Sequence, residues 1–315
     1  MKVLVTGADG FVGRELVSRL EAAGHDVAGA VRPGNAAGTW RDDARRRGVT
    51  VLDLELEDPA SVARVAEWPA DAVVHLAAVA SSREARQDPG LAWTVNAAGT
   101  ARILEGLAAA RERSGRDTRV LVVSSGEVYG DGPHRPRVES DPVAPQSPYA
   151  ASKAAAELAA HEVARRTGLA VIVARAFQHT GPGQSEAYVV PALARRLAEA
   201  RRNGRRQIPA GNLDPVRDIT DVRDVVSAYV ALLEGAPAGT YNVSRGEGFA
   251  LRDILARLAA ILGVEAEPVT DPALARRSDI PHLVGDPARL RAATGWSPAY
   301  SIERTLRDVV DAQAD

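Results

Sequence analysis

The chain has 315 residues, long enough for one large domain or for two interlocked ones. Its composition, with 45% hydrophobic and 25% charged residues, favours a water-soluble globular protein and excludes an intrinsically disordered one. The 39 lysines and arginines nearly balance 41 acidic residues, for a net charge of -2, so no overall positive field would attract nucleic acid or an acidic membrane surface.

Residue types that support thiol or metal chemistry are scarce. The chain has no cysteine, which excludes disulfides, thiol nucleophiles and thiolate metal sites, and its six histidines form no H-E-x-x-H pair, so we expect no metal site. No apolar stretch approaches the length of about 18 residues that a membrane span needs, and the N-terminal apolar run is too short for a signal peptide. We therefore expect a cytoplasmic protein without a membrane partner.

The first half of the chain alternates short apolar runs with longer segments of helical periodicity. We expect strands where residues on both faces of the strand would be apolar, at 3–5, 27–31, 49–52, 72–76, 120–123 and 170–173. Helices are expected over residues 12–23, 92–113 and 149–166. This alternation predicts an α/β fold with a parallel sheet and crossover helices.

The second half is less regular. Its periodicity predicts helices at residues 190–200, 221–233, 251–262 and 302–312, a strand at 239–243 and an irregular connection over 276–286. We expect residues 1–177 to form the sheet domain, to which 217–245 return. Residues 178–216 and 246–315 would form a smaller, mostly helical substrate lobe over the carboxyl edge of the sheet, where open α/β sheets bind ligands.

A glycine-rich run follows the first predicted strand and opens the first predicted helix. Gly7 permits a tight turn, Gly10 lets backbone amides approach a pyrophosphate, and Gly13 allows close helix–sheet packing. The helix N-terminus, at Phe11 and Val12, adds partial positive charge. The run between a strand and a helix predicts a Rossmann-type doubly wound sheet that binds a dinucleotide.

Arg32 ends the second predicted strand, roughly 25 residues after Gly7, where a Rossmann fold places the residue that reads the adenosine ribose. A guanidinium can bind a 2′-phosphate, so Arg32 favours NADP(H) over NAD(H), which remains possible. The alternative is an ordinary surface arginine. Further cofactor contacts are expected along the neighbouring segments, from Asp53, Leu54, Leu76, Ala77, Ala78 and Asn96.

Tyr149 and Lys153 stand four residues apart in a predicted helix, so they share one face. An ammonium close to a phenol lowers the pKa of the phenol and lets it exchange a proton near neutrality. Ser125, just after the predicted strand at residues 120–123, could bind the same substrate oxygen. A Tyr-x-x-x-Lys pair alone is common on surface helices, but the combination with Ser125 and the glycine run predicts a catalytic centre.

These motifs resemble the extended short-chain dehydrogenase/reductases, the NAD-dependent epimerase/dehydratase group, over nearly the whole chain. Segments 176–185, 211–225, 276–281, 285–287 and 294–296 are similar to one branch, the GDP-6-deoxy-mannose reductases. The resemblance implies an NAD(P)-dependent oxidoreductase that reduces the C4 ketone of a GDP-linked 4-keto-6-deoxy sugar to a GDP-D-rhamnose-type product. Ser125 would polarise the ketone, Tyr149 would act as general acid, and Lys153 would hold the nicotinamide ribose.

The resemblance also implies substrate contacts from the smaller lobe, by Asn212, Arg217, Arg276 and Asp279. Gln178 stands where the family usually has Asn, and Arg277 replaces the usual proline after Arg276. Both departures bear on the sugar and its stereochemistry. The alternative for each residue is an ordinary loop salt bridge.

Other functions remain open from the sequence. Glu127 is expected to bind a substrate hydroxyl or to join the proton relay, but the related GDP-mannose 4,6-dehydratases carry a carboxylate there too, so a dehydratase or an epimerase is the first alternative. A non-catalytic NADP-binding sensor is the alternative from another class. The resemblance implies a homodimer built on the helices at 92–113 and 149–166.

Overall fold

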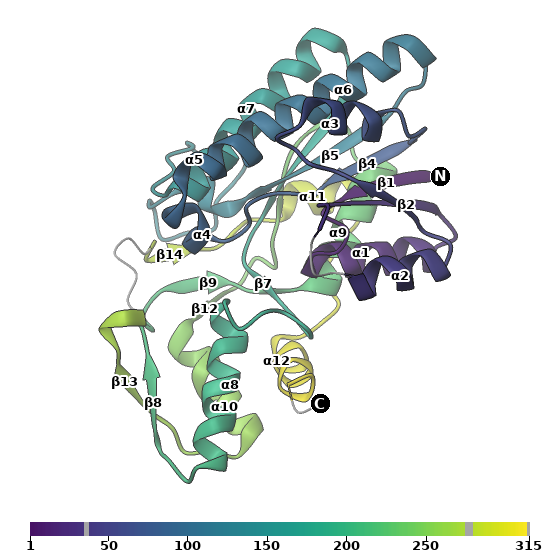
Figure 1. Ribbon diagram of the computed structural model, residues 1–315. Helices are drawn as coiled ribbons and strands as arrows, with labels where there is room; N and C mark the ends of the chain where they lie inside the picture. Colours follow the sequence, from purple (N-terminus) through teal and green to yellow (C-terminus); the bar gives the residue numbers. More distant parts are fainter. Residues whose placement is uncertain (35–37, 275–279, 314–315) are drawn as a thin grey trace.

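A computed structural model describes residues 1–34, 38–274 and 280–313. Its larger part is a sheet of seven parallel strands in the order β11-β6-β5-β4-β1-β2-β3 (Figure 1). The strands are β1 (Lys2–Thr6), β2 (Asp26–Val31), β3 (Thr50–Asp53), β4 (Ala72–His75), β5 (Arg119–Ser125), β6 (Ala170–Ala176) and β11 (Gly239–Val243). The predicted α/β, doubly wound fold is therefore confirmed.

Helices cover both faces of the sheet because its strands are apolar on both sides. On β1, Val3 and Val5 join one buried cluster while Leu4 joins the other. One face carries α3 (Pro59–Ala66), α6 (Gly99–Ser114) and α7 (Pro148–Thr167); the other carries α1 (Phe11–Ala22), α2 (Gly38–Arg46), α9 (Val222–Gly235) and α11 (Ala288–Thr294) (Figure 1). This two-sided burial explains why the apolar runs predicted the strands well.

The predicted helix at residues 92–113 differs from the observed structure. The chain forms α4 (Ser82–Gln87), α5 (Pro89–Ala92), a π-helical segment (Trp93–Ala98) and then α6. Asp88 begins α5 by accepting a hydrogen bond from the Leu91 amide, and Pro89 suits the first helical position. π-Helical turns are often found at functional sites, and this one carries Asn96.

A smaller lobe lies at the carboxyl edge of the sheet (Figure 1). Its helices α8 (Val189–Arg202), α10 (Leu251–Leu262) and α12 (Ile302–Asp311) bury a core of their own. Short strands accompany them: β7 (His179–Thr180), β8 (Gln207–Ala210), β9 (Val216–Asp218), β10 (Thr220–Asp221), β12 (Gly248–Ala250), β13 (Glu267–Thr270) and β14 (His282–Leu283). The predicted irregular connection at 276–286 was partly wrong, because β14 pairs there with β9.

Among the described residues, no helix is long and apolar enough to cross a membrane.

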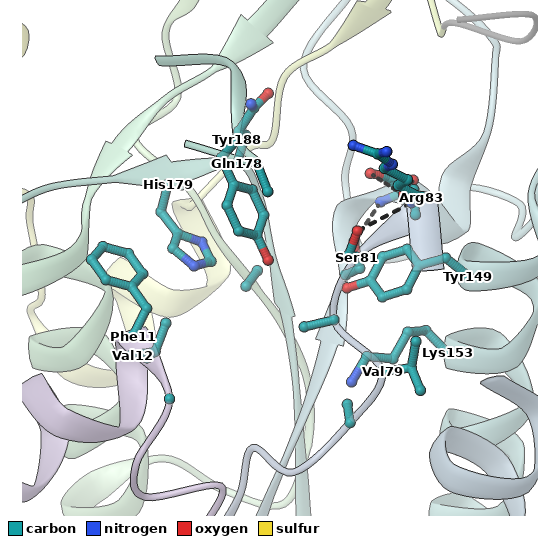
Figure 2. A pocket seen from close by; sticks show the side chains of 18 of the residues that line it. Phe11, Val12, Val79, Ser81, Arg83, Tyr149, Lys153, Gln178, His179 and Tyr188 are labelled. Carbon is teal, nitrogen blue, oxygen red and sulfur yellow. Dashed lines mark hydrogen bonds between the residues drawn. The ribbon is translucent and has the colours of Figure 1, made fainter. Parts of the chain in front are cut away.

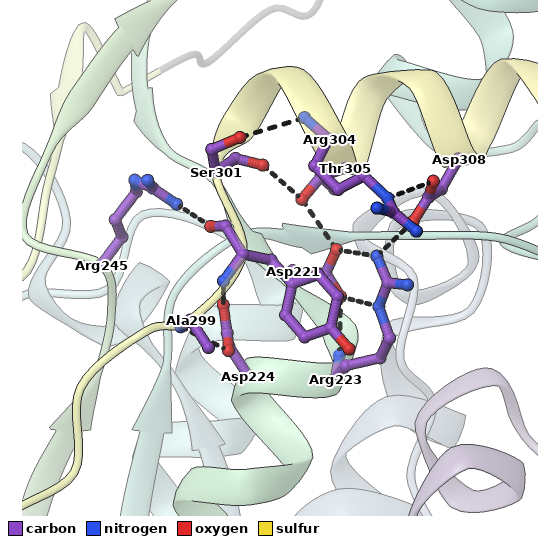
Figure 3. Close-up of polar contacts among 10 residues, drawn as sticks. Asp221, Arg223, Asp224, Arg245, Ala299, Ser301, Arg304, Thr305 and Asp308 are labelled. Carbon is purple, nitrogen blue, oxygen red and sulfur yellow. Dashed lines mark hydrogen bonds and ion pairs between the residues drawn. The ribbon is translucent and has the colours of Figure 1, made fainter.

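A buried polar network joins α9 of the sheet domain to the C-terminal helix α12 (Figure 3). Asp221 accepts hydrogen bonds from the Arg223 amide (2.9 Å), the Arg223 guanidinium (2.7 Å) and the Thr305 hydroxyl (2.7 Å). Arg223 also pairs with Asp308 at 2.7 Å. Asp224 accepts from the amides of Ala299 and Tyr300. The network therefore fastens α12 to the sheet domain.

We predict that Asp221→Ala destabilises the protein because it leaves the Arg223 Nε without its carboxylate partner and removes one of the two hydrogen bonds of the buried Thr305 hydroxyl, which keeps only its bond to the Ser301 carbonyl. The expected loss is about 3 kcal/mol in the free energy of unfolding, measured by urea titration. The control Asp43→Ala removes an exposed carboxylate that also pairs with arginine, and should cost less than about 1 kcal/mol. Equal losses in the two variants would contradict the structural role of the network.

Candidate active site

A cavity of about 1150 Å³ lies between the carboxyl edge of the sheet and the smaller lobe. The sheet order reverses between β1 and β4, the kind of switch point at which α/β proteins bind ligands. In Figure 2, Tyr149 and Lys153 point into the cavity from one wall, while Phe11, His179 and Tyr188 lie across from them. The cavity is large enough for more than one small ligand.

The glycine run forms the floor of one end of the cavity. Gly7 has a left-handed backbone with φ of +68°, and a Cβ at Gly13 would lie 2.2 Å from the Gly7 carbonyl oxygen. Gly10 begins α1 without any side-chain cap, so the amides of the first turn are available to an anion. Phe11 and Val12 line the same end. This geometry fits a pyrophosphate.

Arg32 follows β2 and also lines the cavity. Its guanidinium pairs with two carboxylates, Glu55 at 3.1 Å and Glu57 at 3.5 Å. Leu54 lines the cavity beside it, whereas Asp53 does not and instead pairs with Arg41 at 2.7 Å. Arg32 is therefore placed to meet a ligand, but it already has acidic partners.

The segment after β4 contributes Leu76, Ala77 and Ala78 to the cavity wall. Asn96 is buried behind this wall and does not line the cavity. Its side chain accepts from the Val79 amide (2.8 Å) and donates to the Val79 carbonyl (3.1 Å). Asn96 therefore fixes the shape of the wall.

Ser125, Tyr149 and Lys153 all line the cavity. Ser125 ends β5, and Ser147 caps α7 so that Tyr149 falls in its first turn and Lys153 one turn later. The Lys153 ammonium donates to the carbonyl of Val123 at 2.8 Å. The structure thus gathers the three residues that the sequence predicted to act together.

The pKa values of these groups differ from the sequence prediction. Burial raises the pKa of the Tyr149 phenol above its usual value and the Glu127 charge raises it further, while a hydrogen bond with Ser125 acts in the opposite direction. Burial lowers the pKa of Lys153 to about 8, and Glu157 opposes that shift. The predicted lowering of the Tyr149 pKa was wrong, because burial raises this pKa more than any neighbouring group lowers it.

Glu127 lies in the short helical turn after β5 and lines the cavity. Ser125 accepts a hydrogen bond from the Glu127 amide at 3.1 Å. The Ser82 hydroxyl, at the start of α4, donates to the Glu127 carboxylate at 3.2 Å. Ser82 was missed in the sequence analysis, since nothing in the linear pattern brings residues 82 and 127 together.

The smaller lobe contributes Gln178, Asn212 and Arg217 to the cavity. Asn212 accepts a hydrogen bond from the Asp214 amide at 3.0 Å, and Arg217 donates to the Ile280 carbonyl at 2.6 Å. Arg276 and Asp279 lie outside the described residues. The lobe therefore presents polar side chains opposite the sheet edge.

Several further cavity residues were not predicted. Tyr188, which precedes α8, lies across the cavity from Tyr149 (Figure 2), and Arg83 and Arg196 add positive charge. His179 stacks on Phe11 with a ring separation of 6.3 Å, and burial lowers its pKa. No sequence pattern marks Tyr188 or Arg196, because their place depends on how the lobe folds over the sheet.

Comparisons with known proteins agree with this architecture. The model of the family described as GDP-mannose 4,6 dehydratase matches residues 4–309. The chain is 35% identical to GDP-6-deoxy-D-mannose reductase of Pseudomonas aeruginosa, over 98% of this chain and 96% of that protein.

Solved structures give the same result. The structure of RMD from Pseudomonas aeruginosa complexed with NADPH has a TM-score of 0.84 at 34% identity, covering 99% of this chain and 98% of that one. The Thermus thermophilus UDP-glucose 4-epimerase complex with NAD has a TM-score of 0.85 at 32% identity, with coverage of 99% and 98%. The predicted resemblance is confirmed: the chain belongs to the GDP-mannose 4,6-dehydratase family of the extended short-chain dehydrogenase/reductases.

Proposed function

We propose that this protein is an NAD(P)H-dependent reductase of the C4 ketone of a GDP-linked 4-keto-6-deoxy sugar. The observation that carries the proposal is the placement of the half-buried Tyr149 phenol in the same cavity as Ser125 and Lys153. Its similarity to GDP-6-deoxy-D-mannose reductase supports this choice of reaction.

The residues at the sheet edge fit a dinucleotide coenzyme. The uncapped start of α1 suits the pyrophosphate, and Gly13 is a position where a Cβ would collide with backbone. Arg32 suits a 2′-phosphate, so NADPH is the preferred coenzyme and NADH a possible one. Lys153 would hold the nicotinamide ribose. When bound, the coenzyme supplies the hydride.

The side chains of this site supply the proton that a reduction requires. A raised pKa keeps Tyr149 protonated, so its hydroxyl can donate to the oxygen of the carbonyl being reduced. Ser125 hydrogen-bonds to that oxygen and polarises it, and the Lys153 ammonium stabilises the phenolate that remains.

Substrate binding is assigned to the lobe side of the cavity. Gln178, Asn212 and Arg217 would contact the nucleotide sugar, and we extend this role to Arg276 and Asp279 on the resemblance alone. Glu127, oriented by Ser82, would bind a sugar hydroxyl.

A GDP-mannose 4,6-dehydratase is the second candidate function. The Glu127 carboxylate favours it, because this side chain lines the cavity and its charge acts on Tyr149. A carboxylate so placed could also remove a sugar proton during loss of water.

The two functions are separated by supplying the purified protein either with NADPH and the GDP-linked 4-keto-6-deoxy sugar or with NADP⁺ and GDP-mannose, and following the product by mass spectrometry. Addition of two hydrogens to the keto sugar supports the reductase. Loss of water from GDP-mannose would establish the dehydratase instead.

We predict that Tyr149→Phe lowers turnover by about 10²- to 10⁴-fold, because the variant lacks the general acid. Coenzyme affinity, measured by the fluorescence of bound NADPH, should stay within about threefold of wild type. The control Tyr241→Phe removes a phenol that donates to the Pro237 carbonyl outside the cavity, and should leave turnover unchanged. Full turnover in Tyr149→Phe would refute the assigned role, and absence of turnover in the wild-type protein that still binds NADPH would point to the non-catalytic sensor.

We also predict that turnover falls as the pH rises through about 8. Lys153 is a base whose pKa is lowered to about 8, so it is charged below that pH and neutral above it. Only the charged form stabilises the phenolate. A kcat profile that stays flat between pH 7 and about 9.5 would show that the Lys153 charge is not needed.

A further inference from the structure

The carboxyl ends of β2 and β3 place one arginine against two acids at the adenosine end of the cavity. Arg32 follows β2, and Glu55 stands two residues beyond the end of β3. The Arg32 Nε donates to Glu55 Oε2 at 3.1 Å, and a second guanidinium nitrogen lies 3.5 Å from Glu57 Oε2. Arg32 and Glu55 both line the cavity, whereas Glu57 does not.

The backbone around Glu55 is anchored, and the Glu55 carbonyl accepts a hydrogen bond from the Asp58 amide at 3.1 Å. The Glu55 amide donates to the Ser61 hydroxyl at 2.9 Å, and the amide of the preceding residue, Leu54, donates to the Val31 carbonyl at 2.9 Å. The Glu55 side chain is 31% exposed, against 58% for Arg32. The carboxylate is thus held at the cavity wall, while the guanidinium has more freedom to move.

The other arginines near this point are engaged elsewhere. Arg41 pairs with Asp53 at 2.7 Å and donates to the Arg32 carbonyl at 3.0 Å, and Arg102 donates to the Leu56 carbonyl at 3.0 Å. Among the described residues, Arg32 is the arginine whose ion pairs with Glu55 and Glu57 are seen. Glu55 is the nearer of the two carboxylates to Arg32 and the one that lines the cavity, so a 2′-phosphate must compete mainly with Glu55 for the guanidinium, whereas a free 2′-hydroxyl carries no such charge.

We propose that Glu55 is the residue that limits coenzyme selectivity in this protein, by competing with the 2′-phosphate of NADPH for Arg32. The proposal rests on the proposed function only in assuming that an NAD(P) coenzyme binds here. It predicts a site that accepts both coenzymes. Arg32 attracts the phosphate and Glu55 reduces that attraction.

The test measures the dissociation constants of NADPH and NADH by coenzyme fluorescence on the full chain, without sugar substrate. In Glu55→Gln the ratio of the NADH constant to the NADPH constant should rise about 5- to 10-fold, and the gain should shrink with added salt because it is electrostatic. The control Glu57→Gln removes the same charge from an acid outside the cavity and should change the ratio less than about twofold.

The double variant Arg32→Gln/Glu55→Gln tests the mechanism. Its reference is Arg32→Gln alone. If Glu55 acts through Arg32, the double variant and Arg32→Gln should have nearly the same ratio of the NADH constant to the NADPH constant. A change below about threefold in Glu55→Gln, a shift toward NADH, or an equal effect in Glu57→Gln overturns the proposal. Failure of wild type to bind either coenzyme would instead overturn the proposed function, and thermal melting verifies that each variant is folded.

Discussion

The close approach of two backbone segments at the switch point of the sheet governs the rest of the site. A Cβ at Gly7 would lie 2.9 Å from the amide nitrogen of Ala77, and one at Gly13 would lie 2.2 Å from the Gly7 carbonyl oxygen. Both glycines are therefore required by the protein's own packing, before any ligand is considered. A Cβ at Gly10 would lie 3.2 Å from that oxygen, a contact that a small shift could relieve. The floor of the cavity is consequently backbone, with its amides exposed to a ligand.

A buried chain of hydrogen bonds connects this floor to the catalytic helix. It links β1, β4, α6 and the π-helical segment to α7, through Thr6, His75, Thr100, Asn96, Ser152 and the carbonyl of Tyr149. Burial, followed by the Lys153 charge, lowers the pKa of His75 to about 3, so the imidazole stays neutral and acts as a structural member. The position of Tyr149 relative to the coenzyme end thus depends on a network that does not titrate near neutral pH.

Much of this arrangement could be predicted from the sequence, for reasons that the structure makes clear. Strands buried on both faces are continuous apolar runs, and Tyr149 and Lys153 share a helical face whatever the tertiary fold. Contacts between residues far apart in the chain leave no pattern in the sequence. Ser82 meets Glu127 only after α4 docks, Asp53 turns to Arg41 rather than to the cavity, and the phenol pKa depends on burial. Spacing predicts which side chains share a surface, but not their solvation.

The charge of Lys153 shows how deeply the core supports the chemistry. Burial opposes this charge, and Glu157 on the next helical turn favours it. Glu157 is itself buried, accepts a hydrogen bond from Ser124, and pairs with Arg175 of β6 at 2.7 Å. A buried carboxylate of this kind persists only when a partner compensates its desolvation, so Arg175 is needed for Glu157 to act on Lys153. Side chains from β5, β6 and α7 therefore act together to keep the Lys153 ammonium charged.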